Sequence, residues 1–561
     1  MRDGIAAEIV DLALQPKPEL VIHAGNLPAT AEALRDLLAA SGRLFDRGLP
    51  VRVIRPADGA APSAMPLTKH NVVIEAHRLC QPVKVNSKGE FVPVTLLDRV
   101  SQMYLDMSGE WKLSPLAGVT TAPLLSADGG VRSADGYDSS TALWCCSIPT
   151  LRLSLRPSHA DAEGALRLLR QAFQTFPFGD APRRWDISLE VEVVDITKPP
   201  GRDESAFLVA LLTAVCRPSL WLAPGMLITA PAVSGAGTGK GLLVRAICTI
   251  AFGVGPRAFT AGSERQELDK RLAAELIEAQ PVLFLDNANG IALRSDTLAS
   301  VLTERPARVR LLGQTRMVPL NSTAFVAITG NGLTVTEDLA RRFIPCELDA
   351  RCEDPEQRPF PTGFLDQVKQ RRTELLAAAL TIWRWGRQNA TGLKRGKPLG
   401  SFESWADWCR DPFLALGCRD PVECIESLKA NDPRRQRIAD LFCTWWEQHG
   451  ATPVKANQLA EPVKAIADPQ GRGRQYLATL LSGLAGTHAA GFVLTRQEAA
   501  GKWAAATYAL TKAAPPGPAG HRTHRMDEPI NGELCAPARP MGPMPDDLEG
   551  GALPAGAEAE I

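Results

Sequence analysis

The stretch that decides the fold runs from residue 226 to residue 252 and reads MLITAPAVSGAGTGKGLLVRAICTIAF. Its first five residues are apolar except for Thr229, its centre is a run of small residues, and its last part has an apolar helical pattern. The pattern predicts a short buried strand over 226–230 and a helix over 240–252. A strand that turns through glycines into a helix is typical of one unit of a parallel α/β sheet.

The glycine-rich turn has the composition of a phosphate-binding loop. Small residues let backbone N–H groups point inward, the helix N-terminus adds partial positive charge, and Lys240 adds a full charge. The match to GxxxxGK[ST] has two departures, Ser234 in place of the first glycine and Gly241 in place of the hydroxyl residue. A glycine-rich turn is also common without a ligand. We expect a nucleotide to bind residues Ser234, Gly235, Ala236, Gly237, Thr238, Gly239, Lys240 and Gly241.

Further apolar strands alternate with helices downstream of this loop. The helices are expected at 240–252, 264–279 and 296–303, and the strands at 258–261, 282–286, 324–329 and 343–348. Short apolar strands that alternate with helices indicate a parallel sheet covered on both faces. The fold class we predict for this part is therefore α/β, with a parallel sheet as its core.

Two of these strands lead into polar residues. The strand at 282–286 ends in Asp286, which Asn287 follows, and the strand at 324–329 leads through Gly330 to Asn331. The carboxyl ends of strands form the ligand-binding edge of an open α/β sheet, so these side chains are candidates for a catalytic site. The alternative is that Asp-Asn and Asn-Gly form ordinary turns.

Two groups of arginines are candidates for contacts with phosphate. Arg341 and Arg342 stand at the end of a short helix, where they either stabilise the helix dipole or complete a site in a neighbouring subunit. Residues 308–320 have two alternating arms around Gly313 and Gln314, which predicts a β-hairpin. Arg310 and Arg316 on its arms either bind DNA phosphates or are merely solvated.

The order of these features is loop, acid strand, hairpin, Asn strand and paired arginines. In this order the chain resembles the ring-forming AAA+ ATPases, among them the superfamily 3 helicases, and more closely the primase–helicase-like proteins of prophages and integrative elements. The resemblance covers residues 15–510 and is carried by 231–241, 283–287, 328–334, 337–342, 114–120 and 136–138. It implies an ATP-dependent DNA helicase or translocase in the replication of a mobile genetic element, working as a hexamer around single-stranded DNA.

The resemblance also implies roles for individual residues. Lys240 would contact the β- and γ-phosphates of ATP, Asp286 would bind Mg²⁺, and Asn331 would sense the γ-phosphate. Arg341 or Arg342 would act as an arginine finger in the neighbouring subunit. The hairpin would project into the ring channel, where Arg316, with Arg310 second, would grip a DNA phosphate.

Two departures from the family pattern bear on hydrolysis. Gly241 lacks the hydroxyl that normally binds Mg²⁺. Asn287 stands where many such ATPases have a glutamate base, and an amide orients water but cannot accept its proton. Hydrolysis would then be slow or would use other ligands such as Glu264, Asp296 or water. ATP binding is the firmer expectation.

Breaks in composition divide the chain into four parts. Residues 1–198 mix helix and strand patterns without the paired carboxylates of a primase or polymerase, so we expect an α+β domain for origin or partner recognition. Residues 205–350 form the P-loop core. Residues 356–512 form a helical and winged-helix-like domain, with Arg472 and Arg474 at a DNA-binding helix and Arg496 and Lys502 on the wing. Residues 513–561 are rich in Pro, Gly, Ala and acids and are expected to be a disordered tail.

The whole-chain charge excludes a general basic coat for nucleic acid, because 62 Lys and Arg balance 62 Asp and Glu over 561 residues. No run of 18 apolar residues occurs, so we expect no membrane partner and a cytoplasmic protein. Two other functions stay open. One is a DNA-binding scaffold or regulator with a degenerate nucleotide site, and the other is a primase–helicase with an unrecognised primase centre.

Overall fold

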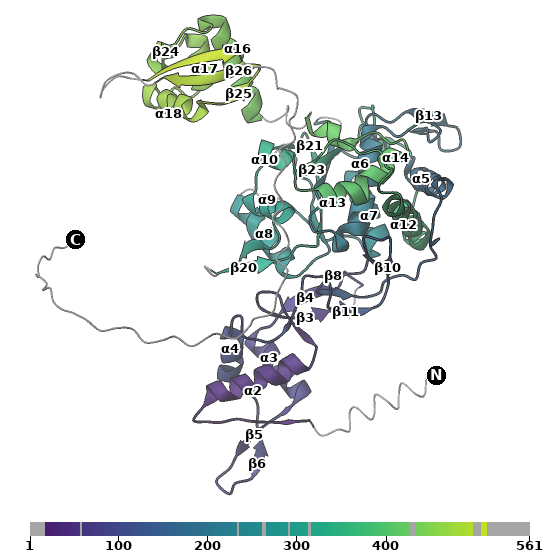
Figure 1. The fold of residues 1–561 in the computed structure, drawn as a ribbon, viewed down its shortest axis with the longest axis vertical. Coiled ribbons are helices and arrows are strands. Elements are labelled where there is room, and N and C mark those ends of the chain that lie inside the picture. The colour runs from purple at the N-terminus through teal and green to yellow at the C-terminus, as the bar shows by residue number, and fades with distance from the viewer. Residues whose placement is uncertain are drawn as a thin grey trace, which may run out of the picture.

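The computed structural model describes residues 17–56, 59–232, 235–260, 265–289, 292–311, 316–426, 433–497 and 506–512 (Figure 1). Several sequence predictions lie outside these residues: Ser234, Glu264, the hairpin turn at Gly313 and Gln314, Lys502, and the tail at 513–561. No helix among the described residues is both long enough and apolar enough to cross a membrane.

A five-stranded parallel sheet forms the centre of the molecule. Its strands lie side by side in the order β16 (Ala258–Phe259), β17 (Val282–Leu285), β21 (Phe325–Asn331), β15 (Gly225–Ala230) and β23 (Phe343–Glu347). The prediction of a parallel α/β sheet is confirmed. Because β21 inserts between β15 and β17, the residues that follow these three strands meet at one edge of the sheet.

Helices cover both faces of this sheet. On β15, Met226 and Ile228 belong to the apolar cluster of one face, and Leu227 belongs to the cluster of the other. Successive side chains of a strand point to opposite faces, so a strand buried on both sides must be apolar throughout. The first face carries α6 (Arg202–Cys216), α7 (Lys240–Phe252) and α12 (Arg372–Gln388), and the second carries α8 (Arg265–Ile277) and α9 (Asp296–Thr303).

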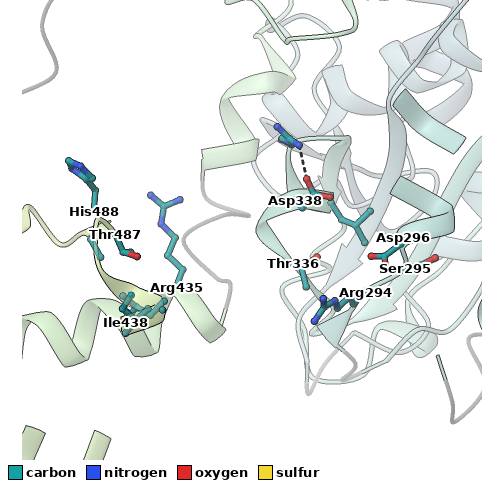
Figure 2. Close-up of a pocket in the computed structure, with 14 residues that line it drawn as sticks. Arg294, Ser295, Asp296, Thr336, Asp338, Arg435, Ile438, Thr487 and His488 are labelled. Carbon is teal, nitrogen blue, oxygen red and sulfur yellow. Dashed lines mark hydrogen bonds and ion pairs between the residues drawn. The ribbon is translucent and has the colours of Figure 1, made fainter. Parts of the chain in front are cut away.

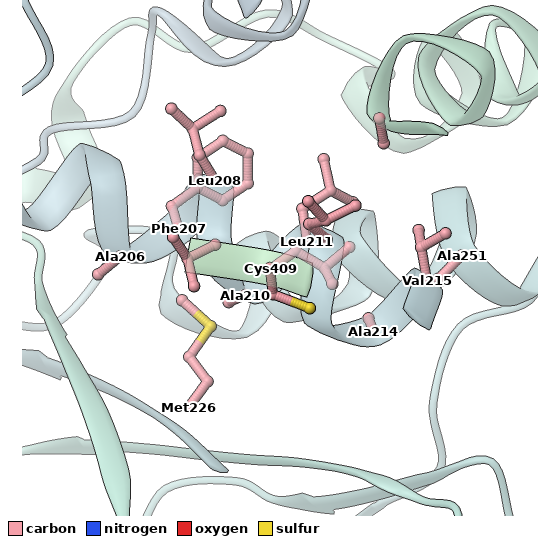
Figure 3. Packing of buried hydrophobic residues seen from close by; sticks show 14 of the residues in the cluster. Ala206, Phe207, Leu208, Ala210, Leu211, Ala214, Val215, Met226, Ala251 and Cys409 are labelled. Carbon is pink, nitrogen blue, oxygen red and sulfur yellow. The ribbon is translucent and has the colours of Figure 1, made fainter. Parts of the chain in front are cut away.

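Helix α6 is buried on all sides. Every residue from Asp203 to Cys216 is shielded from solvent, and its apolar side chains contact Met226 and Cys409 on neighbouring elements (Figure 3). A helix that is apolar all round belongs in the interior of a large core. The same cluster includes segments both before and after the sheet, namely α5 (His159–Phe173), α11 (Phe364–Gln370), α13 (Glu403–Trp405) and α14 (Asp411–Ala415).

The apolar clusters therefore group the chain at points other than residues 198 and 356. The cluster around α6 draws its residues from 122–425 and so crosses both points, and the cluster on the other face of the sheet draws its residues from 227–343. Two further clusters lie within residues 20–111 and 441–510. Trp383 is fully buried in the cluster around α6, and Trp385 is 6% exposed, so neither ring is open to stack on a nucleic-acid base. Between the N-terminal core and α5 lie β8 (Gly118–Thr120), β9 (Leu124–Leu125), β10 (Val131–Arg132), β11 (Gly136–Asp138) and β12 (Leu143–Cys145).

The N-terminal part is an α+β unit. Its helices α2 (Leu27–Ala40), α3 (Lys69–Leu79) and α4 (Asp98–Asp106) pack together in one apolar cluster. Its strands form two small sheets: β1 (Glu19–Val21), β5 (Gln81–Val85) and β6 (Phe91–Pro93), and β4 (Ser63–Pro66), β3 (Pro50–Ile54), β2 (Leu44–Asp46) and β7 (Ser114–Pro115).

The C-terminal unit begins with α16 (Pro433–His449). Two helices follow it, α17 (Glu461–Ala467) and α18 (Arg474–Leu484), and then two strands, β26 (Phe492–Gln497) and β27 (Thr507–Lys512). The short strands β24 (Val454–Lys455) and β25 (His488–Ala489) lie at the edges of their sheet. Helix α17 begins only at Glu461, because Val454 pairs with β27 and Pro462 lies in the first turn of the helix.

Three small strand pairs complete the described fold. They are the hairpin of β13 (Arg183–Asp186) and β14 (Val191–Val194), the hairpin of β19 (Ala307–Arg310) and β20 (Met317–Leu320), and the parallel pair β18 (Ala292–Leu293) and β22 (Thr334–Val335), which α10 (Glu337–Ala340) follows. The prediction of a hairpin over 308–320 is confirmed for its two arms.

Candidate functional site

The glycine loop links β15 to α7 and folds back on itself. Gly237 and Gly239 have φ angles of +72° and +92°, a region that residues with a side chain rarely adopt. At Gly235 a β-carbon would lie 2.2 Å from the carbonyl oxygen of Pro231, so only glycine fits. The loop thus needs its glycines for close backbone approach.

Lys240 is the first residue of α7 and its side chain turns into the loop. Its Nζ donates hydrogen bonds to the Gly235 carbonyl oxygen at 2.6 Å and to Thr238 Oγ1 at 3.2 Å, and the residue is only 8% exposed. Burial lowers the pKa of Lys240, and the charge of Asp286 opposes this effect. The ammonium group therefore lies inside the loop, at the positive end of a helix, where a phosphate would also bind.

Asp286 is held by a residue that the sequence analysis did not single out. Thr329 Oγ1 on β21 donates a hydrogen bond to Asp286 Oδ1 at 2.5 Å and accepts one from the backbone N–H of Asn287 at 3.2 Å. Asn287 has a φ angle of +58°, which asparagine tolerates better than most residues. One buried hydroxyl therefore fixes the orientation of both Asp286 and Asn287.

Asn331 ends β21, next to Ala230 at the end of β15. Its side-chain oxygen is buried and has no hydrogen-bond partner within the described part of the chain. A β-carbon on Gly235 would lie 2.7 Å from this oxygen, so the amide faces the glycine loop. An unpaired buried acceptor is costly, and a ligand or water in the loop would satisfy it.

The residues beside Asp286 do not supply the usual pair of Mg²⁺ ligands. A β-carbon at Gly241 would lie 3.5 Å from Asp286 Oδ2 and 3.6 Å from Oδ1, so position 241 faces the carboxylate, but it carries no hydroxyl. Asp286 Oδ1 already accepts from Thr329, and Oδ2 lies 3.9 Å from Arg245 Nη2. These residues therefore offer an ammonium group in the glycine loop, but they do not offer the hydroxyl-plus-carboxylate pair expected for magnesium.

The two arginines after β22 differ in exposure. Arg341 and Arg342 both form ion pairs with Asp338, at 2.6 Å and 2.9 Å. The Arg341 side chain is 57% exposed, whereas that of Arg342 is 13% exposed. The Arg341 side chain is therefore accessible to another molecule, whereas most of the Arg342 side chain is buried against the protein itself.

The hairpin arginines lie on exposed positions of β19 and just before β20. Val309 and Val318 face the core, which leaves Arg308 and Arg310 on the outer face of β19. Arg316 Nη2 donates to the Gly48 carbonyl oxygen of the N-terminal part at 3.1 Å. The end of the hairpin next to its turn is thus in contact with the turn between β2 and β3.

Three basic side chains surround one shallow cavity of about 560 Å³ in the C-terminal unit. Lys455, Arg474 and Arg496 come from β24, α18 and β26, and Arg496 Nη1 donates to Ser482 Oγ at 3.1 Å. Arg472 lies instead over the ring of Tyr476, 4.8 Å from its centroid. Lys455 was not predicted from the sequence, because it is distant in the chain from the other two.

A second cavity, of about 870 Å³, separates the sheet core from the C-terminal unit. Arg294, Asp296 and Asp338 lie on the core side, and Arg435 and His488 lie on the other side (Figure 2). Arg341 also lines this cavity, but the glycine loop and Asp286 do not. The cavity is thus separate from the candidate nucleotide site.

No protein-family model matches this chain, and no curated protein matches it. Three solved structures show low similarity. The NrS-1 C-terminal region in its apo A form is 12% identical with a TM-score of 0.37, over 86% of this chain and 99% of that one. The SCCmec type IV Cch active helicase is 13% identical with a TM-score of 0.31, over 83% and 92%. An inhibitor-bound JCV helicase is 14% identical with a TM-score of 0.19, over 49% and 74%.

Proposed function

We propose that this protein is an ATP-dependent DNA helicase or translocase that acts in the replication of a mobile genetic element. The observation that carries the proposal is the site at the sheet edge: Lys240 lies in a glycine loop at a helix N-terminus, and Asp286 and Asn331 follow the two neighbouring strands. The proposed architecture is an AAA+-like P-loop core with a winged-helix unit at 433–512 and an α+β unit that recognises an origin or a partner.

The proposed ligand is ATP. The backbone N–H groups of the loop and the ammonium group of Lys240 would bind its β- and γ-phosphates. The N–H groups supply partial positive charge and Lys240 supplies a full one, both at the N-terminus of α7. The unpaired oxygen of Asn331 would accept a hydrogen bond from the attacking water and so orient it toward the γ-phosphate. Asn287 cannot accept the proton of that water, so we expect slow turnover.

The proposed assembly is a homo-oligomeric ring, with six subunits as the family resemblance implies. Arg341 is the better candidate for an arginine finger, because more than half of its side chain is exposed. Arg342 would then support Asp338, which holds Arg341 in place.

DNA would bind at two places. The β19–β20 hairpin would line the ring channel and offer Arg310 and Arg316 to the phosphates of a single strand. The cavity between α18 and β26 would take a further phosphate, since Lys455, Arg474 and Arg496 surround it. Arg472, on the ring of Tyr476, would lie at the edge of this second surface.

ATP hydrolysis by the full chain, with and without single-stranded DNA, tests this proposal. We expect slow turnover that DNA raises, and at least about a hundredfold loss in Lys240→Ala, as for other groups that stabilise transferring phosphates. Lys270→Ala is the matched control, because Lys270 is an exposed lysine whose ion pair is with Glu267 on the same helix, α8. Unchanged turnover in Lys240→Ala would contradict the proposal.

A DNA-binding scaffold with a nucleotide site that does not turn over is the second candidate. It is favoured by the missing hydroxyl at Gly241 and by the two partners that already engage Asp286. ATP binding without hydrolysis under any DNA condition would favour this candidate over the motor.

A further inference from the structure

Two positions of α7 face the same carboxylate oxygen. A β-carbon at Gly241 would lie 3.5 Å from Asp286 Oδ2, and Arg245 Nη2 lies 3.9 Å from that oxygen. Residues four apart on a helix share one face, so Gly241 and Arg245 lie one turn apart on the side of α7 that faces β17. The chain therefore has a cation next to the place where the family pattern has a hydroxyl.

Arg245 is held in this position by more than its charge. Its guanidinium lies over the ring of Phe284, 5.7 Å from the ring centroid, and Phe284 precedes Asp286 by two residues. The side chain is 39% exposed, so one side of the guanidinium remains open to solvent. A guanidinium that is planar, always charged and partly open suits a phosphate oxygen.

We propose that Arg245 serves as the cation of this nucleotide site, so that ATP binds without a divalent metal ion. This inference rests on the proposed function, because it concerns the same glycine loop. Mg²⁺ gives up its water reluctantly and requires well-placed oxygen ligands. Here position 241 has no oxygen to offer, and an ion at Asp286 would have to displace Arg245.

The charges around the glycine loop support the same conclusion. Lys240 and Arg245 provide two positive charges, the helix N-terminus adds part of another, and Asp286 provides one negative charge. ATP brings its own negative charge, so Arg245 can move from Asp286 to a phosphate oxygen at little electrostatic cost. The metal ion that normally screens Asp286 from the phosphates is then not needed for binding.

Calorimetric titration of ATP into the full chain, in excess MgCl₂ or in excess EDTA, tests the proposal. We expect the wild-type Kd to change by less than about threefold between the two buffers. Arg245→Gln should weaken binding in EDTA by about tenfold or more, since a hydrogen bond to a charged group contributes about 1.5–3 kcal/mol. Binding in Mg²⁺ should suffer less.

Gly241→Ser supplies the missing hydroxyl, and its β-carbon would lie at an ordinary contact distance of 3.5 Å from Asp286 Oδ2. We expect this variant to bind ATP at least about tenfold more tightly in Mg²⁺ than in EDTA. Gly241→Ala is its matched control: it adds a β-carbon at the same position without a hydroxyl, and its Kd should differ by less than about threefold between the two buffers.

Two results would overturn this inference and leave the proposed function intact. One is a wild-type Kd that rises about tenfold or more in EDTA, and the other is an Arg245→Gln variant that binds ATP in EDTA as tightly as the wild type does. Absence of ATP binding in both buffers would instead overturn the proposed function, and this inference with it.

Discussion

At the scale of single residues, Thr329 is the side chain on which the candidate site depends most. Its hydroxyl is fully buried and links the carboxylate of Asp286 to the backbone of Asn287. Because a buried donor or acceptor that loses its partner keeps the full cost of desolvation, the arrangement is sensitive to removal of one oxygen atom.

We expect Thr329→Val to lower the free energy of unfolding by about 1–3 kcal/mol, because it leaves the Asn287 N–H without its acceptor and Asp286 Oδ1 without its donor. Thr329→Ser keeps the hydroxyl and should restore most of this loss. Thermal unfolding of the three proteins measures the effect, and equal stability of the valine and serine variants would contradict it.

At the scale of elements, the first turn of α6 joins β23 to the turn before β13. Asp203 accepts hydrogen bonds from the backbone N–H groups of Glu347, at 2.8 Å, and Asp180, at 3.2 Å. Burial raises the pKa of Asp203 from 3.8 to about 7, the two backbone hydrogen bonds oppose this shift, and the charges of Asp180 and Glu347 add to it. The packing of three elements therefore depends on one carboxyl group that titrates near neutrality.

The raised pKa gives a pH dependence with a definite sign. The folded protein holds the Asp203 proton more tightly than the unfolded chain does, so this group favours folding at low pH and its contribution is lost as pH rises from 3.8 to about 7. We expect the stability of Asp203→Asn, relative to wild type, to increase with pH across this range. Thermal unfolding from pH 4 to pH 8 measures this difference. Asp366→Asn, at an exposed aspartate, is the control. The prediction would be contradicted if the difference in stability between the wild type and Asp203→Asn did not change with pH.

At the scale of the whole molecule, Arg47 ties the N-terminal part to the sheet core. Its buried guanidinium donates to the carbonyl oxygens of Leu276, at 2.6 Å, and Ala117, at 2.7 Å, and it also reaches Ile277 and Leu116. Leu276 and Ile277 end α8, so the cation also lies at the negative end of a helix. Burial lowers its pKa to about 10, so it stays charged at neutral pH.

We expect Arg47→Met to leave these carbonyl groups without a donor, and so to loosen the contact between the N-terminal part and α8 by about 1–3 kcal/mol. Limited proteolysis should then release the N-terminal part at protease concentrations that leave the wild type intact. Arg43→Met, at a more exposed arginine of the same part, is the control, and equal resistance of all three proteins would contradict the prediction.

Much of the secondary structure follows from local pattern. The helix predicted over 240–252 spans those residues, and the five strands of the sheet lie at or within a few residues of their expected positions, because burial on both faces requires an unbroken apolar run. The grouping of elements did not follow: α5, α11 and α12 share the core of α6 although they lie before and after the sheet in the chain. Their apolar faces indicate burial but do not say against which partner.

The sequence by itself determined the order of strands and helices, the glycine loop and the chemistry of its lysine, since each depends on residues that are neighbours in the chain. Only the tertiary structure decided that Thr329 holds Asp286, that Arg245 lies at the same carboxylate as Gly241, and that Arg47 joins α8 to the N-terminal part. These contacts join residues about 40 to 230 positions apart. No local periodicity records such pairs, because the packing of whole elements brings them together.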